Sequence, residues 1–347
     1  MVNTPFRIAL DAMGGDHAPA NEIAGALHAT RLLARYGIEH SVVLVGEPGR
    51  IQREFSRFGS VPTTIAIEAA PDVVAMDDDP ASVIRTKPDS SLVRGLELVQ
   101  QNRADAFVSA GNTGAVLSAA TLMLGRIPGV IRPTIGAFFP TSNGTPCLVL
   151  DVGANAEVKP QYLYQFALMG SLYTEYIGGI EHPRVGLLNI GEEATKGTDT
   201  VRQAYELFRN STINFIGNVE GRDIFRGVAD VVVCDGFTGN VVLKFAESIM
   251  PMLKAVLERY SQRNLVTRIA VGLLAPILRR ALRDFDYQTY GGVPLLGVRG
   301  IVIIGHGKSS PLAISNMIRR AWEIYRMRLG DQIERALMQQ VLMQNPA

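Results

Sequence analysis

Short apolar runs alternate along most of the chain with polar, glycine-containing loops and helical segments. The runs that begin at Phe6, Asp105, Val185 and Asp230 are examples, and each is followed by a polar loop. Strands that alternate with helices are typical of an open, mostly parallel sheet that is covered by helices. We therefore predict an α/β protein in which residues 1–347 form a single three-layer α/β/α domain.

The pattern changes near residue 250, where a helical periodicity continues with few turn residues to residue 286. We expect residues 250–286 to form a helical arm, which Pro276 should break or kink. Arginines alternate in this arm with apolar residues, among them Leu265, Ile269, Leu273, Leu274 and Ile277. Three interpretations remain open: the arm belongs to the core, packs against a second subunit, or lies at a membrane surface with its arginines toward anionic lipid.

The composition is that of a globular protein, with 47% hydrophobic and 19% charged residues in a chain of 347. The net charge of +1 provides no overall field that would attract nucleic acid, so we expect no nucleic-acid partner. Cys147 and Cys234 lie in apolar runs and are expected to be buried free thiols, which suits a reducing cytosol. The first residues do not resemble a signal peptide, and no apolar run is long enough to span a bilayer. We therefore expect a cytoplasmic protein.

Polar residues that suit an anionic ligand gather in the loops after the predicted strands. In an open parallel sheet, ligands bind beyond the carboxyl ends of the strands, where such loops meet. Glycine, asparagine and aspartate are also ordinary turn residues, and Asn112 or Thr113 could simply cap the helix that follows. The candidate site residues are Asp11, Gly14, Gly15, Asp16, His17, Asn112, Thr113, Asn155, Asn189, Lys196, Asn218, Asp235, Asn240 and His306.

Several classes of site have no matching motif. The chain contains no G-x-G-x-x-G dinucleotide fingerprint, no G-x-S-x-G nucleophile elbow and no cysteine or histidine cluster with zinc spacing. The segment Gly307-Lys308-Ser309 resembles the end of a P-loop, but Val302 stands where that motif needs its first glycine. We therefore predict no metal ion and no cofactor, and a site that binds phosphate and stabilises a developing oxyanion. These residues do not define the second substrate.

Five segments together resemble the PlsX family of bacterial phosphate acyltransferases: Asp11–Pro19, Ser109–Ala115, Asp151–Asn155, Gly217–Asp223 and Asp235–Asn240. Two further segments, residues 291–297 and 305–307, match in the same order, so the resemblance covers nearly the whole chain. It implies a fold similar to phosphotransacetylases and isocitrate/isopropylmalate dehydrogenases. It also implies the conversion of long-chain acyl-[acyl carrier protein] and inorganic phosphate to acyl phosphate and free carrier protein, the first step toward phosphatidic acid, by a homodimer that contacts the membrane peripherally.

This resemblance suggests individual roles. Lys196 would bind phosphate and offset charge in the tetrahedral intermediate, Asn240 would donate to the oxyanion, and His17 with Asp16 would position or deprotonate phosphate. The other polar candidates would line the site. Because acyl carrier protein is strongly acidic, basic residues near the site or on the arm would dock it. The alternatives are a phosphotransacetylase-like enzyme that uses acyl-coenzyme A, a nicotinamide-dependent dehydrogenase and a non-enzymatic scaffold.

Overall fold

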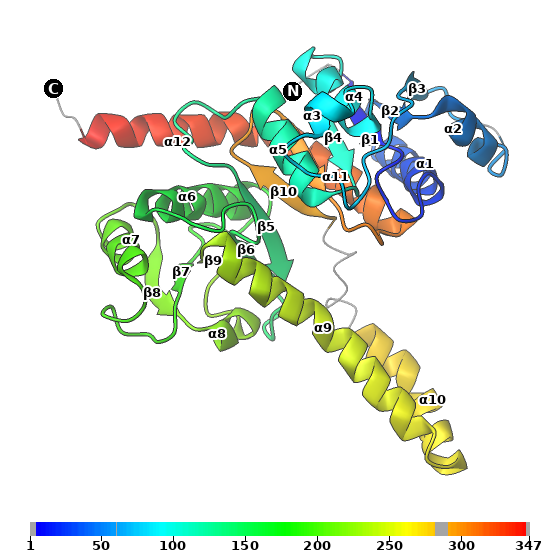
Figure 1. The fold of residues 1–347 in the computed structure, drawn as a ribbon. Coiled ribbons are helices and arrows are strands. Elements are labelled where there is room, and N and C mark those ends of the chain that lie inside the picture. Colours follow the sequence, from blue (N-terminus) through cyan, green and yellow to red (C-terminus); the bar gives the residue numbers. More distant parts are fainter. Residues whose placement is uncertain (1–4, 60, 282–290, 345–347) are drawn as a thin grey trace.

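The computed structural model describes all residues except 1–4, 60, 282–290 and 345–347. The described residues form one eleven-stranded sheet, shown with its helices in Figure 1. In sheet order its strands are β3 (Ile65–Ala69), β2 (His40–Gly46), β1 (Phe6–Asp11), β4 (Ala106–Ser109), β11 (Ile301–Ile304), β10 (Val293–Leu296), β5 (Thr134–Phe139), β6 (Cys147–Leu150), β9 (Val231–Val233), β7 (Val185–Leu188) and β8 (Phe215–Val219).

The sheet contains two parallel sets of strands that run in opposite directions. β10 is antiparallel to both β11 and β5, and β5 is antiparallel to β6. Because the direction reverses three times between β11 and β6, the first half (β3, β2, β1, β4 and β11) is opposite in direction to the second half (β6, β9, β7 and β8). The prediction of a mostly parallel sheet is confirmed, but the carboxyl ends of the two halves lie on opposite edges.

Helices cover both faces of the sheet, as the three-layer prediction requires. One face packs against α1 (Ala20–Arg35), α2 (Pro48–Phe55), α6 (Pro160–Tyr176), α7 (Asp199–Arg209), α11 (Pro311–Met327) and α12 (Leu329–Gln344). The other face packs against α3 (Val83–Thr86), α4 (Ser91–Gln100), α5 (Thr113–Met123) and α8 (Gly221–Arg226). Alternation along β1 shows why: Ile8 and Leu10 belong to the first core and Ala9 to the second. Cys147 and Cys234 are buried and free, as predicted.

The arm is a pair of helices, α9 (Gly236–Ser261) and α10 (Leu265–Ala281), that projects away from the sheet (Figure 1). Residues 250–281 of the predicted arm lie in these helices, and residues 282–286 are outside the described part of the chain. Pro276 does not end α10, which continues for five more residues. The helix tolerates it because this surface is exposed, and water can solvate the carbonyl group that the proline leaves without its usual partner.

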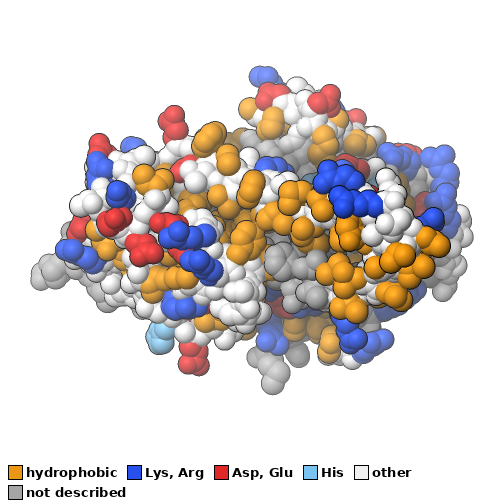
Figure 2. Space-filling model, turned by 90° about the horizontal axis from the view of Figure 1, so that it is seen from below, with side chains coloured by type: hydrophobic (Ala, Val, Ile, Leu, Met, Phe, Trp, Pro, Cys, Tyr) orange, Lys and Arg blue, Asp and Glu red, His pale blue; other side chains and the backbone are white. Residues whose placement is uncertain are grey.

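The apolar side chains of the arm are not part of the core of the single chain. Leu273 is 72% exposed, and Leu265, Ile269, Leu274 and Ile277 are exposed as well. Figure 2, which views the molecule from below, shows hydrophobic side chains gathered on the arm, with Lys and Arg side chains beside them. Within the described residues, no helix is long and apolar enough to cross a membrane.

Candidate active site

The first loop after β1 is built around the buried carboxyl group of Asp11. Its oxygens accept hydrogen bonds from the Met13 amide at 3.0 Å and from the Ser109 hydroxyl at 2.7 Å. Burial raises the pKa of this carboxyl above its ordinary value. Gly14 lies so close that a Cβ there would be 2.5 Å from an Asp11 oxygen and 2.8 Å from the Gly111 amide. Asp11 and Gly14 therefore hold the loop in shape, and a ligand would not reach Asp11 without moving it.

Glu22, in the first turn of α1, is a buried acid that the sequence analysis did not select. It is 1% exposed, and its Oε2 has no hydrogen-bond partner within the described structure. Burial, together with the nearby carboxylates of Asp11 and Asp16, raises its pKa to about 8. Its other oxygen lies against Gly15, where any side chain would collide with it. The sequence does indicate that Glu22 is buried, because residues 22, 26, 29 and 33 follow helical spacing and therefore lie on the same, buried face of α1.

The remaining candidates of the first half lie in exposed loops beside this core. Asp16 and His17 are exposed, and the Asp16 amide donates to the Gly307 carbonyl at 2.8 Å, which joins the first loop to the loop after β11. His306 is exposed in that second loop, and its Nδ1 accepts a hydrogen bond from the Lys308 amide at 3.1 Å.

Asn112 has the capping role that the sequence left open. Its Oδ1 accepts from the Ala115 amide at 3.0 Å, which caps α5. Its Nδ2 donates to backbone carbonyls of the loop between β3 and α3. Thr113 is the exposed first residue of the helix. Since both ends of the Asn112 side chain are engaged, this residue organises the loop and is not free to bind a ligand.

In the second half, Asp151 at the end of β6 has the same structural role as Asp11. Its carboxyl group accepts from the amides of Gly153 and Ala154, and both the backbone and the side-chain amide of Asn155 donate to its Oδ2 at 2.7 Å. Burial raises the pKa of Asp151 above its ordinary value. Asn155 also donates to the Pro133 carbonyl at 2.8 Å, so it fixes the loop to the residue that precedes β5.

The start of α9 packs directly onto this loop. Asp235 caps the helix, accepting from the Thr238 amide at 2.8 Å and from its hydroxyl at 2.7 Å. The Gly236 amide donates to the Asn155 carbonyl at 2.8 Å. Asn240 is exposed in the first turns of the helix, and a Cβ built on Gly153 would be 3.7 Å from its Cγ. Asn240 is therefore free to contact a ligand at the N-terminal end of a helix, where partial positive charge favours anions.

Lys196 lies in the neighbouring loop after β7, which we call the Lys196 loop (residues 190–197). Its side chain is exposed, and no carboxylate within the described structure pairs with its ammonium group. β7 is hydrogen-bonded to both β8 and β9, so this loop, Asn218 and the start of α9 emerge at one edge of the sheet. Unpaired Lys196 and exposed Asn240 give this edge the means to bind an anion and to donate to an oxyanion.

The predicted site residues thus form two groups. Asp11, Gly14, Gly15, Asp16, His17, Asn112, Thr113 and His306 lie at the carboxyl edge of the first half. Asn155, Asn189, Lys196, Asn218, Asp235 and Asn240 lie at the carboxyl edge of the second half. Strand direction assigns the two groups to opposite edges along the hydrogen-bonded ladder, and the accumulated twist of the sheet sets how these edges face each other in space. That the two groups line one site, as expected from the sequence, stays a prediction.

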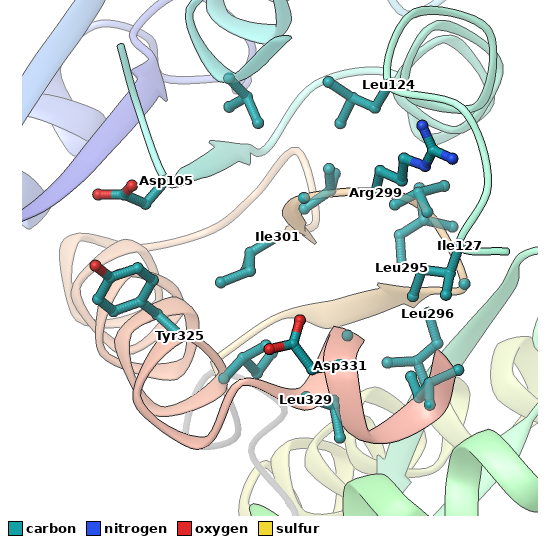
Figure 3. Close-up of a pocket in the computed structure, with 18 of the residues that line it drawn as sticks. Asp105, Leu124, Ile127, Leu295, Leu296, Arg299, Ile301, Tyr325, Leu329 and Asp331 are labelled. Atoms are coloured by element: carbon teal, nitrogen blue, oxygen red, sulfur yellow. The ribbon is translucent and has the colours of Figure 1, made fainter. Parts of the chain in front are cut away.

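A large cavity, of about 1140 Å³, lies elsewhere (Figure 3). It is lined by residues that include Asp105, Leu124, Arg299, Leu329 and Asp331. Asp105 and Arg299 precede β4 and β11, so the cavity is at the amino ends of the first-half strands, and none of the candidate site residues lines it. As for metal sites, no group of three or more His, Cys, Asp or Glu side chains within the described residues is arranged to hold an ion.

The family model described as "Fatty acid synthesis protein" matches residues 6–330 of this chain. The chain belongs to this family. It is 49% identical to the phosphate acyltransferase of Heliobacterium modesticaldum over 317 residues, which cover 91% of this chain and 93% of that protein. It is 47% identical to the phosphate acyltransferase of Nostoc punctiforme, over 93% of this chain and 94% of that protein. The resemblance drawn from the sequence motifs is confirmed, and the chain is an acyltransferase.

Solved structures confirm the predicted relation in fold. A phosphotransacetylase from Streptococcus pyogenes superposes with a TM-score of 0.58 at 16% identity, covering 93% of this chain and 95% of that one. A phosphotransacetylase from Staphylococcus aureus gives a TM-score of 0.57 at 16% identity, over 92% and 94% of the two chains. At this level of identity the likeness concerns the fold alone.

Proposed function

We propose that the chain transfers a long-chain acyl group from acyl carrier protein to inorganic phosphate, giving acyl phosphate and free carrier protein. The observation that carries this proposal is the near-half identity, over nearly the whole chain, to relatives named phosphate acyltransferases. Acyl phosphate formed in this way would enter phospholipid synthesis. The unpaired ammonium group of Lys196 beside the start of α9 supports the phosphate half of the reaction.

The chemistry requires few protein groups. A phosphate oxygen attacks the thioester carbonyl carbon, the C–S bond then breaks, and the thiolate leaves with carrier protein. We assign phosphate binding to Lys196 and hydrogen-bond donation to the carbonyl oxygen, as it becomes an oxyanion, to Asn240. The role expected for His17 and Asp16, positioning or deprotonation of phosphate, would require the first-half group to reach the same phosphate.

The test is acyl phosphate formation from a long-chain acyl carrier protein and phosphate, with no metal or nucleotide added. We expect product, and less product when acyl-coenzyme A replaces the carrier thioester. Efficient turnover of acyl-coenzyme A alone would favour the phosphotransacetylase-like alternative. Absence of product from both thioesters, with folded protein, would contradict the proposed function and favour a scaffold.

We further propose that the arm forms a homodimer contact, a peripheral membrane contact, or both. The exposed apolar side chains of α10 support this proposal, because contiguous apolar surface on a folded chain usually marks an interaction site. Arginines beside them, such as Arg268 and Arg280, would face anionic lipid or the acidic carrier protein. If the arginines dock the carrier, its affinity should fall as salt is raised; an affinity independent of salt would exclude that role.

A further inference from the structure

The Lys196 loop is attached at its base by one asparagine and at its turn by another. We infer that Asn189 and Asn218 are positioning residues that act through Lys196, and that neither binds the substrate directly. This inference rests on the proposed function, because it takes Lys196 as the group that holds phosphate. It replaces the expectation that both asparagines are part of the lining that touches substrate.

Asn189 closes the base of the loop. Its Oδ1 accepts from the Ile190 amide at 2.8 Å, and its Nδ2 donates to the Lys196 carbonyl at 3.1 Å. One side chain thus joins the first residue of the loop to the residue that carries the ammonium group. Gly197 is adapted to this contact, since its φ of +85° favours glycine and a Cβ there would be 2.5 Å from Asn189 Oδ1.

Asn218 closes the turn. Its Nδ2 donates to the Glu193 carbonyl at 2.9 Å, and the same carbonyl accepts the Lys196 amide at 3.1 Å. Asn218 is only 7% exposed at the end of β8, so the donor is supplied from a rigid, buried position. The two hydrogen bonds on one carbonyl fix the backbone from Glu193 to Lys196 relative to the sheet.

The loop itself is otherwise open to solvent. Residues 192–196 are exposed, and Ile190 is 83% exposed. A loop with little burial of its own opens at low free energy unless hydrogen bonds hold it. A lysine that must meet phosphate in a defined position loses much of its effect when its backbone moves, since a displacement of about 1 Å can reduce a rate by about 100-fold. The hydrogen bonds that the side-chain amides of Asn189 and Asn218 make to the loop, which we call the clamps, therefore matter for catalysis although neither asparagine needs to touch the substrate.

The experiment compares Asn218→Asp and Asn189→Ala with wild type in the full chain. Asn218→Asp keeps the shape of the side chain but replaces its donor by a carboxylate that faces the Glu193 carbonyl. Asn214→Ala is a matched control, because Asn214 donates in the same way to the His182 carbonyl at 2.7 Å, elsewhere in the second half. Each variant is assayed for kcat and for KM of phosphate and acyl donor, and amide hydrogen exchange is followed over residues 190–197.

We expect Asn218→Asp to raise the KM for phosphate and to lower kcat/KM for phosphate about 10-fold or more, with a smaller change in the KM of the acyl donor. Asn189→Ala should give a loss of about 5-fold. In both variants the amide hydrogens of residues 190–197 should exchange faster than in wild type. Asn214→Ala should change neither the kinetic constants nor the exchange rates.

A double-mutant cycle separates positioning from direct binding. Because Lys196→Ala should leave no turnover to measure, the cycle is followed by the Kd of phosphate in an equilibrium titration. In the Lys196→Ala background, Asn218→Asp should cause almost no further loss of phosphate affinity, because the residue that it positions is gone. An undiminished further loss would show that Asn218 contacts substrate, and unchanged exchange in the single variants would show that the clamps do not hold the loop. Either result overturns the inference. If wild type itself makes no acyl phosphate, the proposed function fails, while the exchange experiment still decides whether the clamps exist.

Discussion

The buried acid in the first turn of α1 should make the stability of the protein fall as pH rises. The pKa of Glu22 is raised from its ordinary 4.5 to about 8, mainly by burial. Between these values the folded chain retains the proton and the unfolded chain has lost it, so folding takes up a proton. Stability therefore decreases by up to about 1.36 kcal/mol for each pH unit in this window. Below it both states are protonated, and above it both are ionised.

The variant that tests this prediction is Glu22→Gln, whose side chain has the same size and cannot ionise. The full rise of the pKa corresponds to about 5 kcal/mol, and this is a ceiling, because the site can relax or admit water when Glu22 ionises. The amide adds its own, pH-independent effect, since it needs new hydrogen-bond partners. The informative quantity is therefore the change with pH in the difference between variant and wild type, and not the difference at one pH.

The assay is equilibrium urea unfolding of both proteins at several pH values between about 5.5 and 7.5. We expect the variant to gain about 1 to 2.7 kcal/mol over wild type across this range. Glu206→Gln, a change of an exposed glutamate on α7, should give no such trend. A difference between Glu22→Gln and wild type that stays constant with pH would contradict this prediction, because it would mean that Glu22 ionises equally in the folded and unfolded chains.

Three further substitutions, two of them paired with a control substitution, test other parts of the structure. Lys196→Ala should abolish acyl phosphate formation in a folded protein, whereas Lys254→Ala, a change of another exposed lysine, should leave turnover near wild type. Gly239→Ala should disrupt the start of α9, because its Cβ would overlap a buried backbone carbonyl, and calorimetry should show a clear fall in Tm. Gly272→Ala, a helical position in open space, should instead raise stability by up to about 1 kcal/mol. Leu273→Asp should reduce sedimentation with anionic vesicles or shift the molecular mass toward a monomer; no change in either would exclude this part of the arm from both contacts.

The sequence pattern was sufficient to predict elements and the loops that follow them, since both depend on local periodicity and turn chemistry. The apolar runs that begin at Phe6, Asp105, Val185 and Asp230 form the strands β1, β4, β7 and β9, each of which starts within one residue of that position. The relative direction of the two halves was not predictable in the same way. It depends on β10, a short strand within residues 291–297 that pairs antiparallel with β11, the next strand in the chain, and with β5, a strand far earlier in the chain. Because the sequence-based prediction did not include that strand, it assigned all the polar loops to one edge of the sheet.

The same limit explains which candidate residues keep a direct role. A polar residue at a strand end can hydrogen-bond to the backbone of its loop or bind a ligand, and its hydrogen-bond partners in the folded protein show which of the two it does. Asp11, Asn112 and Asp235 accept hydrogen bonds from backbone amides two or three residues further along the chain. The side-chain amide of Asn155 donates to the Pro133 carbonyl and to the Asp151 carboxylate. Residues with such partners were indistinguishable in the sequence from Lys196 and Asn240.

The helix α9 connects the second-half edge of the sheet to the arm. α9 begins at Gly236, where its amide is bonded to the Asn155 carbonyl, and it continues without interruption to Ser261 at the far end of the arm. A helix of 26 residues is about 39 Å long, so α9, which contains Pro251, carries Asn240 near its base and exposed apolar residues toward its tip. Gly236 and Gly239 let this base sit directly on the loop that Asp151 organises. A lipid or subunit contact through the tip of α9 would therefore be made by the same helix that presents Asn240, and a contact through α10 by the helix that packs against it.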